Sequence, residues 1–75
     1  MKIDKEYLES MKNYDAKTLP RYLQTSINGY IEAYSKGERL RVTELYMDLN
    51  SSINIAQWDN EISIEKANEL RDIFM

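Results

Sequence analysis

The 75-residue chain contains no cysteine and no histidine, and each absence removes a class of chemistry. Without cysteine there are neither disulfides nor thiolate ligands for a metal. Without histidine there are no imidazole ligands, and the usual general base near neutral pH is missing, so no serine can be activated as in a hydrolase triad. A small domain that lacks disulfide and metal staples often gains stability from a partner chain, so this composition favours association.

Proline, glycine and long apolar runs are also scarce. The chain has one proline, two glycines and few runs of β-branched residues, and this composition favours helices. With so little glycine there is no glycine-rich phosphate loop. No apolar run approaches the roughly 20 residues of a membrane span. The first ten residues, MKIDKEYLES, carry acids where a signal peptide needs an apolar segment. We therefore expect a cytoplasmic protein that makes no membrane contact.

The charge of the chain is divided unequally between its two halves. Residues 1–37 carry six basic and five acidic side chains, whereas residues 38–75 carry four basic and eight acidic ones. Nucleic-acid binding needs a clustered basic stripe to meet the phosphates, and the sequence has none, which argues against that function. Basic residues do occur in segments 17–21 and 36–41, and dimerisation could bring these segments together. A dimeric nucleic-acid-linked regulator therefore remains an alternative.

Apolar spacing and helix-capping residues predict an all-α fold: a compact bundle of three to four helices in one domain, 1–75. The expected helices span about 4–14, 18–36, 38–58 and 63–74. Asp4, Thr18 and Ser63 are the expected N-caps, because their side chains can accept hydrogen bonds from free amides. Lys36 and Gly37 are expected to end the second helix.

Two of the predicted helices carry unusually much apolar surface. The second has one long stripe, formed by Leu19, Tyr22, Leu23, Ile27, Tyr30, Ile31 and Tyr34. The third has one face with Val42, Leu45, Leu49, Ile53 and Ala56, and a second face with Leu40, Met47, Ile55 and Trp58. Two apolar faces predict that the third helix is sandwiched between other helices.

The stretch DLNSSINIAQWDNEIS, residues 48–63, allows three interpretations. Oxygen-bearing side chains two residues apart, starting at Asp48, resemble a calcium-binding loop, but Ile53 stands where that loop needs glycine. A second interpretation is a helix broken near Asn50, where weak helix formers adjoin. The third is a continuous helix with a polar side, ended by a turn at residues 59–61. We favour the continuous helix, because one helical period explains Leu45, Leu49, Ile53 and Ala56.

No pattern of reactive side chains predicts catalysis. Glu44 and Asp48 lie four residues apart, as do Glu65 and Glu69, and such pairs are usually solvated rather than catalytic. We therefore expect no enzymatic activity, no catalytic residue, no metal site and no cofactor.

The six tyrosines are the remaining functional signal, because tyrosine combines a large apolar ring with a polar tip and is enriched at interfaces. For each tyrosine taken singly, we favour a place at the rim of the monomer's own core. As a set, the second helix offers more aromatic surface than the short first and last helices are expected to cover. The predicted partner-binding face is therefore formed by Tyr22, Ile27, Tyr30 and Tyr34.

Residues 45–74 resemble small uncharacterised helical proteins of phages and mobile elements in low-GC Gram-positive bacteria. The resemblance is carried by Leu45-Tyr46, Ser52-Ile53-Asn54, Glu61-Ile62-Ser63, Ala67 and Leu70-Arg71. It implies a genetic context and no catalytic activity. The expected function is a small protein-binding module, acting on a host or partner protein that it could inhibit by occlusion, with homodimerisation possible. A phage structural or assembly subunit is a further alternative.

Overall fold

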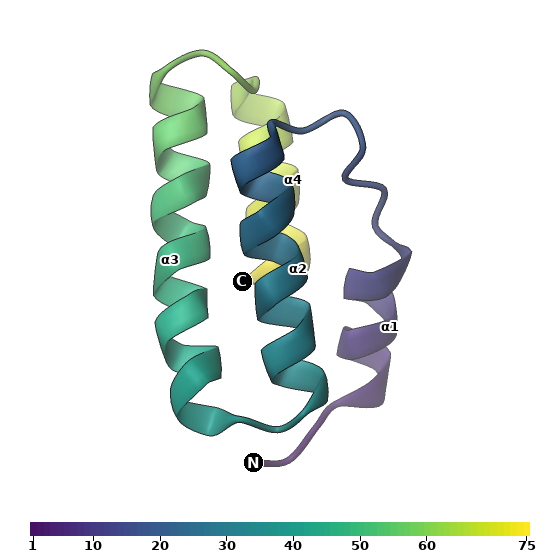
Figure 1. The fold of residues 1–75 in the computed structure, drawn as a ribbon. Helices are drawn as coiled ribbons and strands as arrows, with labels where there is room; N and C mark the ends of the chain where they lie inside the picture. The colour runs from purple at the N-terminus through teal and green to yellow at the C-terminus, as the bar shows by residue number, and fades with distance from the viewer.

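The computed structural model describes all 75 residues and contains four α-helices that run alternately up and down (Figure 1). These are α1 (Lys5–Asn13), α2 (Arg21–Ser35), α3 (Arg39–Trp58) and α4 (Ile64–Phe74). There are no strands. The prediction of an all-α bundle is confirmed, and its four ranges differ from the observed helices by at most three residues at any end.

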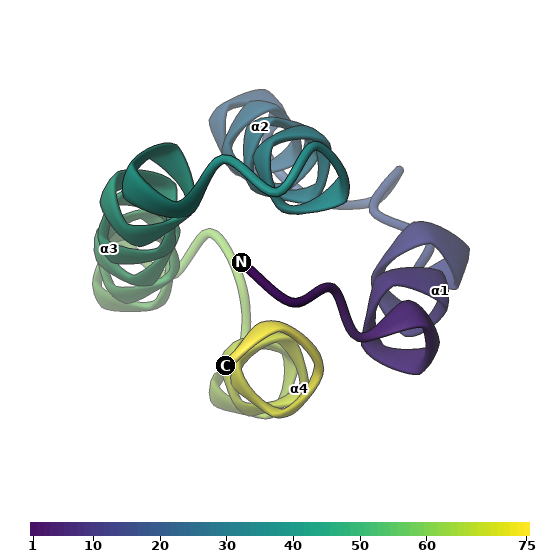
Figure 2. The ribbon, with the colours of Figure 1, turned by 90° about the horizontal axis from the view of Figure 1, so that it is seen from below.

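The four helices surround one core, with each helix beside two neighbours (Figure 2). The most extensive contact joins α2 to α3, while the shorter α4 and α1 close the ring. The core is apolar throughout and contains no buried charged side chain. Its largest fully buried side chains come from all four helices: Met11, Leu23, Ile27, Leu49, Ile53, Leu70 and Phe74.

Two of the expected helix caps form as predicted. The Asp4 carboxylate accepts hydrogen bonds from the amides of Glu6 and Tyr7, and the Ser63 hydroxyl oxygen accepts one from the amide of Lys66. Each satisfies amides that would otherwise lack a partner in the first turn of a helix. Gly37 follows α2 with φ +67°, the left-handed conformation that ends many helices.

Thr18 does not cap the second helix, so that prediction is wrong. The helix begins at Arg21, and Pro20 occupies the N-cap position. The proline ring disfavours helical geometry at the preceding residue, which keeps residues before Pro20 out of the helix. The carbonyl of Pro20 instead accepts the first helical hydrogen bonds, from the amides of Leu23 and Gln24.

Helix α3 is continuous through residues 50–52, which confirms the favoured interpretation of the stretch that starts at Asp48. A calcium-binding loop is excluded there because the backbone is helical, so alternate oxygens cannot converge on one ion. The helix ends at Trp58, and the turn that follows includes Asn60 with a positive φ of 60°.

The prediction that α3 is sandwiched between other helices is wrong. Leu49, Ile53 and Ala56 are buried against the core, but the second apolar face lies open to solvent. The chain has only three other helices, and none of them lies on the outer side of α3 (Figure 2).

The two glycines should respond oppositely to replacement by alanine. A Cβ added to Gly29 would lie 3.9 Å from the Leu45 side chain, an ordinary contact, whereas Gly37 has a positive φ. We expect Gly29→Ala to raise the free energy of unfolding by about 0.5–1 kcal/mol, and Gly37→Ala to lower it by about 1 kcal/mol or more. Urea unfolding followed by circular dichroism measures both. A loss of stability in Gly29→Ala would contradict the room for a Cβ between residue 29 and the Leu45 side chain.

Candidate protein-binding surface

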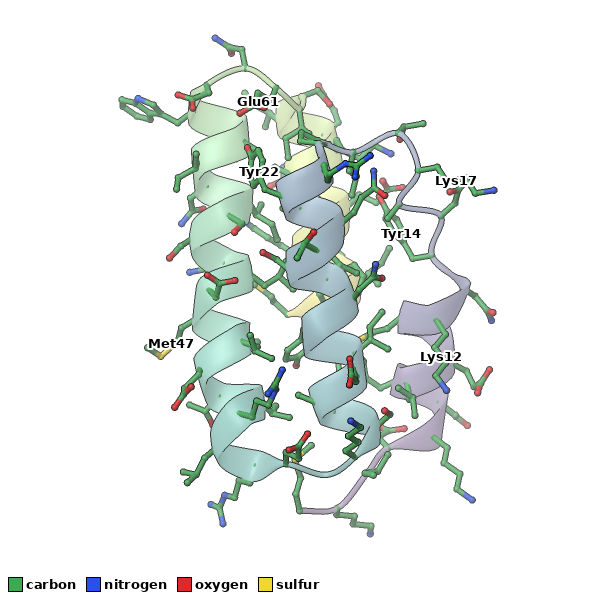
Figure 3. The ribbon with its side chains drawn as sticks, in the orientation of Figure 1. Lys12, Tyr14, Lys17, Tyr22, Met47 and Glu61 are labelled. Atoms are coloured by element: carbon green, nitrogen blue, oxygen red, sulfur yellow. The ribbon has the colours of Figure 1, made fainter.

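The partner-binding face predicted on α2 lies largely inside the molecule. Ile27, Tyr30 and Tyr34 are 2%, 3% and 8% exposed and belong to the core. Only Tyr22, at 38% exposed, reaches the surface. Its hydroxyl donates a hydrogen bond of 2.8 Å to the carboxylate of Glu61, in the turn that joins α3 to α4 (Figure 3). A partner could reach the other three only by opening the bundle, so α2 offers no continuous docking face.

The tyrosine rings of α2 are covered because the neighbouring helices supply aromatic partners. Tyr34 meets the edge of Tyr7 with ring centroids 5.2 Å apart, and Tyr30 lies 6.0 Å from Tyr46. Such pairs add about 0.5–1.5 kcal/mol each beyond the burial of their area. The Tyr34 hydroxyl oxygen also accepts a hydrogen bond from the amide of Asp4. The first helix therefore covers more of α2 than its length suggests.

Tyr7 joins three helices through its hydroxyl group. The hydroxyl donates a hydrogen bond to the carbonyl of Phe74 at the end of α4, and its oxygen lies 3.2 Å from the Tyr30 hydroxyl oxygen. Burial and then the hydrogen bond with Tyr30 raise the pKa of Tyr7 well above its usual value. Burial also raises the pKa of Tyr30. Both groups are therefore held in their neutral form inside the bundle.

These raised pKa values predict that the fold weakens in alkaline solution. Above about pH 10 the tyrosines of the unfolded chain ionise while Tyr7 and Tyr30 stay neutral in the fold, so stability that is complete below pH 10 is lost as the pH rises. We expect Tyr7→Phe to lower the free energy of unfolding by about 1 kcal/mol at pH 8. Urea unfolding at pH 8 and pH 11 should show a smaller alkaline loss in this variant than in the wild type. An equal loss would contradict the role given to Tyr7.

The exposed apolar surface lies on α3, on the side away from the core. We call Leu40, Met47, Ile55 and Trp58 the outer face; they are 81%, 62%, 53% and 87% exposed. Figure 3 shows Met47 projecting from α3 away from α2. At 100° per residue the four side chains fall within an arc of about 80°, roughly opposite Leu49 and its buried neighbours. The four residues therefore form one stripe along the helix, in which the polar side chains of Glu44 and Ser51 are interspersed.

The C-terminal half of the outer face is hollowed. Asn54, Ile55, Trp58 and Asp59 line an open depression of about 280 Å³. Ile55 and Trp58 supply apolar walls, while Asn54 and Asp59 supply polar edges. A depression of this kind fits the side chain of an apolar residue from another molecule better than it fits a metal or a charged ligand.

The ends of α3 carry charges that oppose the dipole of the helix. Arg39 and Arg41 stand in the first turn, where the amide dipoles already give positive potential, and no acidic residue is present in that turn. The N-cap residue, Glu38, makes no side-chain hydrogen bond to the free amides. At the other end the last turn holds no basic residue, and Asp59 and Glu61 follow it. Apart from Glu38 at the N-cap, the charges within about one turn of each end of α3 therefore oppose its dipole.

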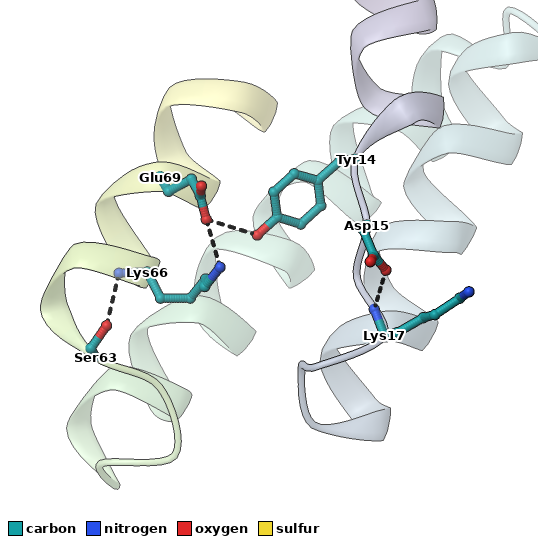
Figure 4. Close-up of polar contacts among 6 residues, drawn as sticks. All are labelled: Tyr14, Asp15, Lys17, Ser63, Lys66 and Glu69. Carbon is teal, nitrogen blue, oxygen red and sulfur yellow. Dashed lines mark hydrogen bonds and ion pairs between the residues drawn. The ribbon is translucent and has the colours of Figure 1, made fainter.

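The other candidate sites are solvated surface. Glu44 is exposed, and Asp48 accepts a hydrogen bond from the Ser26 hydroxyl. Glu69 accepts from both Lys66 and Tyr14, tying α4 to the segment after α1 (Figure 4). No group of three or more acidic side chains is placed to share a metal ion.

The basic segments 17–21 and 36–41 lie at opposite ends of α2. The helix between them, 15 residues long, separates them by about 22 Å. A single copy therefore presents no combined basic surface. No helix in the chain is both long and apolar enough to span a bilayer.

Comparison of the chain with models of protein families, with curated proteins and with solved structures finds no match. The contact surface proposed below is therefore inferred from the residues of this chain alone. The spacing of Leu40, Met47, Ile55 and Trp58 reveals the outer face in the sequence. The sequence does not reveal that the chain has no helix to cover it.

Proposed function

We propose that this chain is a non-enzymatic protein-binding module whose contact surface is the outer face of α3. The observation that carries the proposal is the stripe of four large apolar side chains that the fold leaves in water. Burying one such side chain completely contributes about 1.5–3 kcal/mol. Trp58 is the expected centre of the contact, because tryptophan is the residue type most enriched among energetic hot spots of interfaces.

The kind of partner that fits this surface is an amphipathic helix. The outer face is straight, narrow and about 27 Å long, which matches the stripe of a second helix better than it matches a loop or a flat sheet. Acidic residues in the partner should lie beside Arg39 and Arg41, and basic residues beside Asp59 and Glu61. The contact would then correct the charges that oppose the dipole of α3.

The resemblance of residues 45–74 to phage and mobile-element proteins supports a setting for this module. In that setting the module acts in the cytoplasm on a host or element-encoded protein, and it inhibits that protein by covering a helix that another contact needs. Assembly of a phage structure is the second function with support, because an assembly subunit would use the same kind of apolar helix face.

A photo-crosslinking amino acid placed at residue 47 tests the proposal. We expect p-benzoylphenylalanine in place of Met47 to give discrete protein adducts when the purified protein is irradiated alone or in the lysate of a low-GC Gram-positive bacterium. The matched control carries the same group in place of Lys12, an exposed residue of α1, the helix that lies across the bundle from α3 (Figure 3). Adducts are separated by electrophoresis and identified by mass spectrometry.

Discrete adducts from residue 47 but not from residue 12 would support protein binding by the outer face, whether the captured protein is foreign or a second copy. Absence of adducts from residue 47, or equal adduct patterns from both positions, would overturn the proposed function.

A further inference from the structure

We infer that the helix covering the outer face is α3 of a second copy, packed antiparallel in a two-fold symmetric dimer. The inference rests on the proposed function and names its partner. Three properties of α3 support it. In each, one end of the helix matches the other end, so the two ends meet when a second copy packs in the reverse direction.

The first property is the match between the two ends of the outer face. Leu40, 81% exposed, stands at one end, and the depression beside Ile55 and Trp58 stands at the other. In packing between helices, an apolar side chain inserts between residues one turn apart on the facing helix. In an antiparallel pair, Leu40 of each copy reaches the depression of the other, and the two Met47 side chains meet near the centre.

The second property is charge. In the antiparallel pair the first turn of one α3, with Arg39 and Arg41, lies beside the end of the other, with Asp59 and Glu61. When Leu40 of each copy lies in the depression of the other, Arg41 comes to within about one helical turn of Asp59 of the second copy. An arginine side chain can span that distance. Both residues lie about 90° from the outer face on the same flank, and two-fold symmetry makes those flanks adjacent.

The third property is the direction of the helix dipoles. An antiparallel copy places its acidic end beside the positive end of α3 and its basic end beside the negative end, so both opposed ends are compensated. A parallel pair would instead gather both arginine-bearing first turns at one end of the dimer and both acidic ends at the other, and would set Glu44 against Glu44 of the second copy. Like charges then meet at each end, so the same residues disfavour the parallel arrangement.

The size of the contact predicts a weak, reversible dimer. Two helices of about 10 Å diameter joined over about 27 Å bury on the order of 500 Å² per copy. That area is at the low end for specific protein contacts, so we expect a dissociation constant on the order of 10 µM.

Sedimentation velocity across a range from about 1 µM to 500 µM tests the dimer, using wild type and two charge variants. Arg41→Glu and Asp59→Lys each replace two attractive contacts in the symmetric dimer by repulsive ones, and each should weaken self-association about tenfold. An equimolar mixture of the two variants should dimerise as strongly as the wild type, because every end then meets an opposite charge. Lys17→Glu, which makes the same charge change as Arg41→Glu but on an exposed loop, should leave association unchanged.

Thermal unfolding separates this effect from simple damage to the fold. Both variant side chains agree with the helix dipole better than the original ones do, so monomer stability should stay equal or rise while association falls.

Wild type that remains a monomer up to 500 µM would overturn the inference. If residue 47 still captured a foreign protein, the proposed function would stand without it. A wild-type dimer that Arg41→Glu leaves intact, or a variant mixture no stronger than each variant alone, would overturn the antiparallel arrangement.

Discussion

The contact between α2 and α3 is the interaction on which the rest of the structure depends, because it is the most extensive in the bundle. Leu23, Ile27 and Tyr30 supply the core side of α2, and Leu49 and Ile53 supply that of α3. The shorter α4 and α1 then close the remaining sides. Tyr7 links these two helices to α2 through a single hydroxyl group. Tyr30 and Tyr34 of α2 therefore make their contacts inside the monomer.

Closing the core in this way leaves α3 with more apolar surface than the chain can bury. Each helix of a four-helix ring has two neighbours, and none remains for a second face of α3 (Figure 2). Four large apolar side chains in water are an unfavourable feature that a contact with another helix would remove. The charges at the ends of α3 are also unfavourable in the monomer, because they oppose the dipole of their own helix. They would interact favourably with the ends of an antiparallel helix. Both features support the proposed association along the outer face.

The fold was largely predictable because its signals are local. Capping by Asp4 and Ser63, the stop at Gly37 and the period of the buried residues all act within a few positions of the chain. Thr18 shows the limit of such rules, because the steric effect of Pro20 on its predecessor outweighs a favourable capping residue. Whether a helix face is covered by another helix does not depend on local sequence. Tyr30 and Leu40 both lie on apolar stripes, but the arrangement of all four helices buries Tyr30 and leaves Leu40 exposed.

The single tryptophan allows the most direct measurement of which α3 face is left uncovered. Trp58 fluorescence, recorded well below the expected dissociation constant, reports the surroundings of one residue of the outer face in the folded monomer. We expect emission typical of an indole in water, and acrylamide quenching nearly as strong as that of a free tryptophan derivative. Blue-shifted emission that resists quenching at the same dilution would show Trp58 inside the monomer, and would contradict the division of α3 into a core face and an outer face.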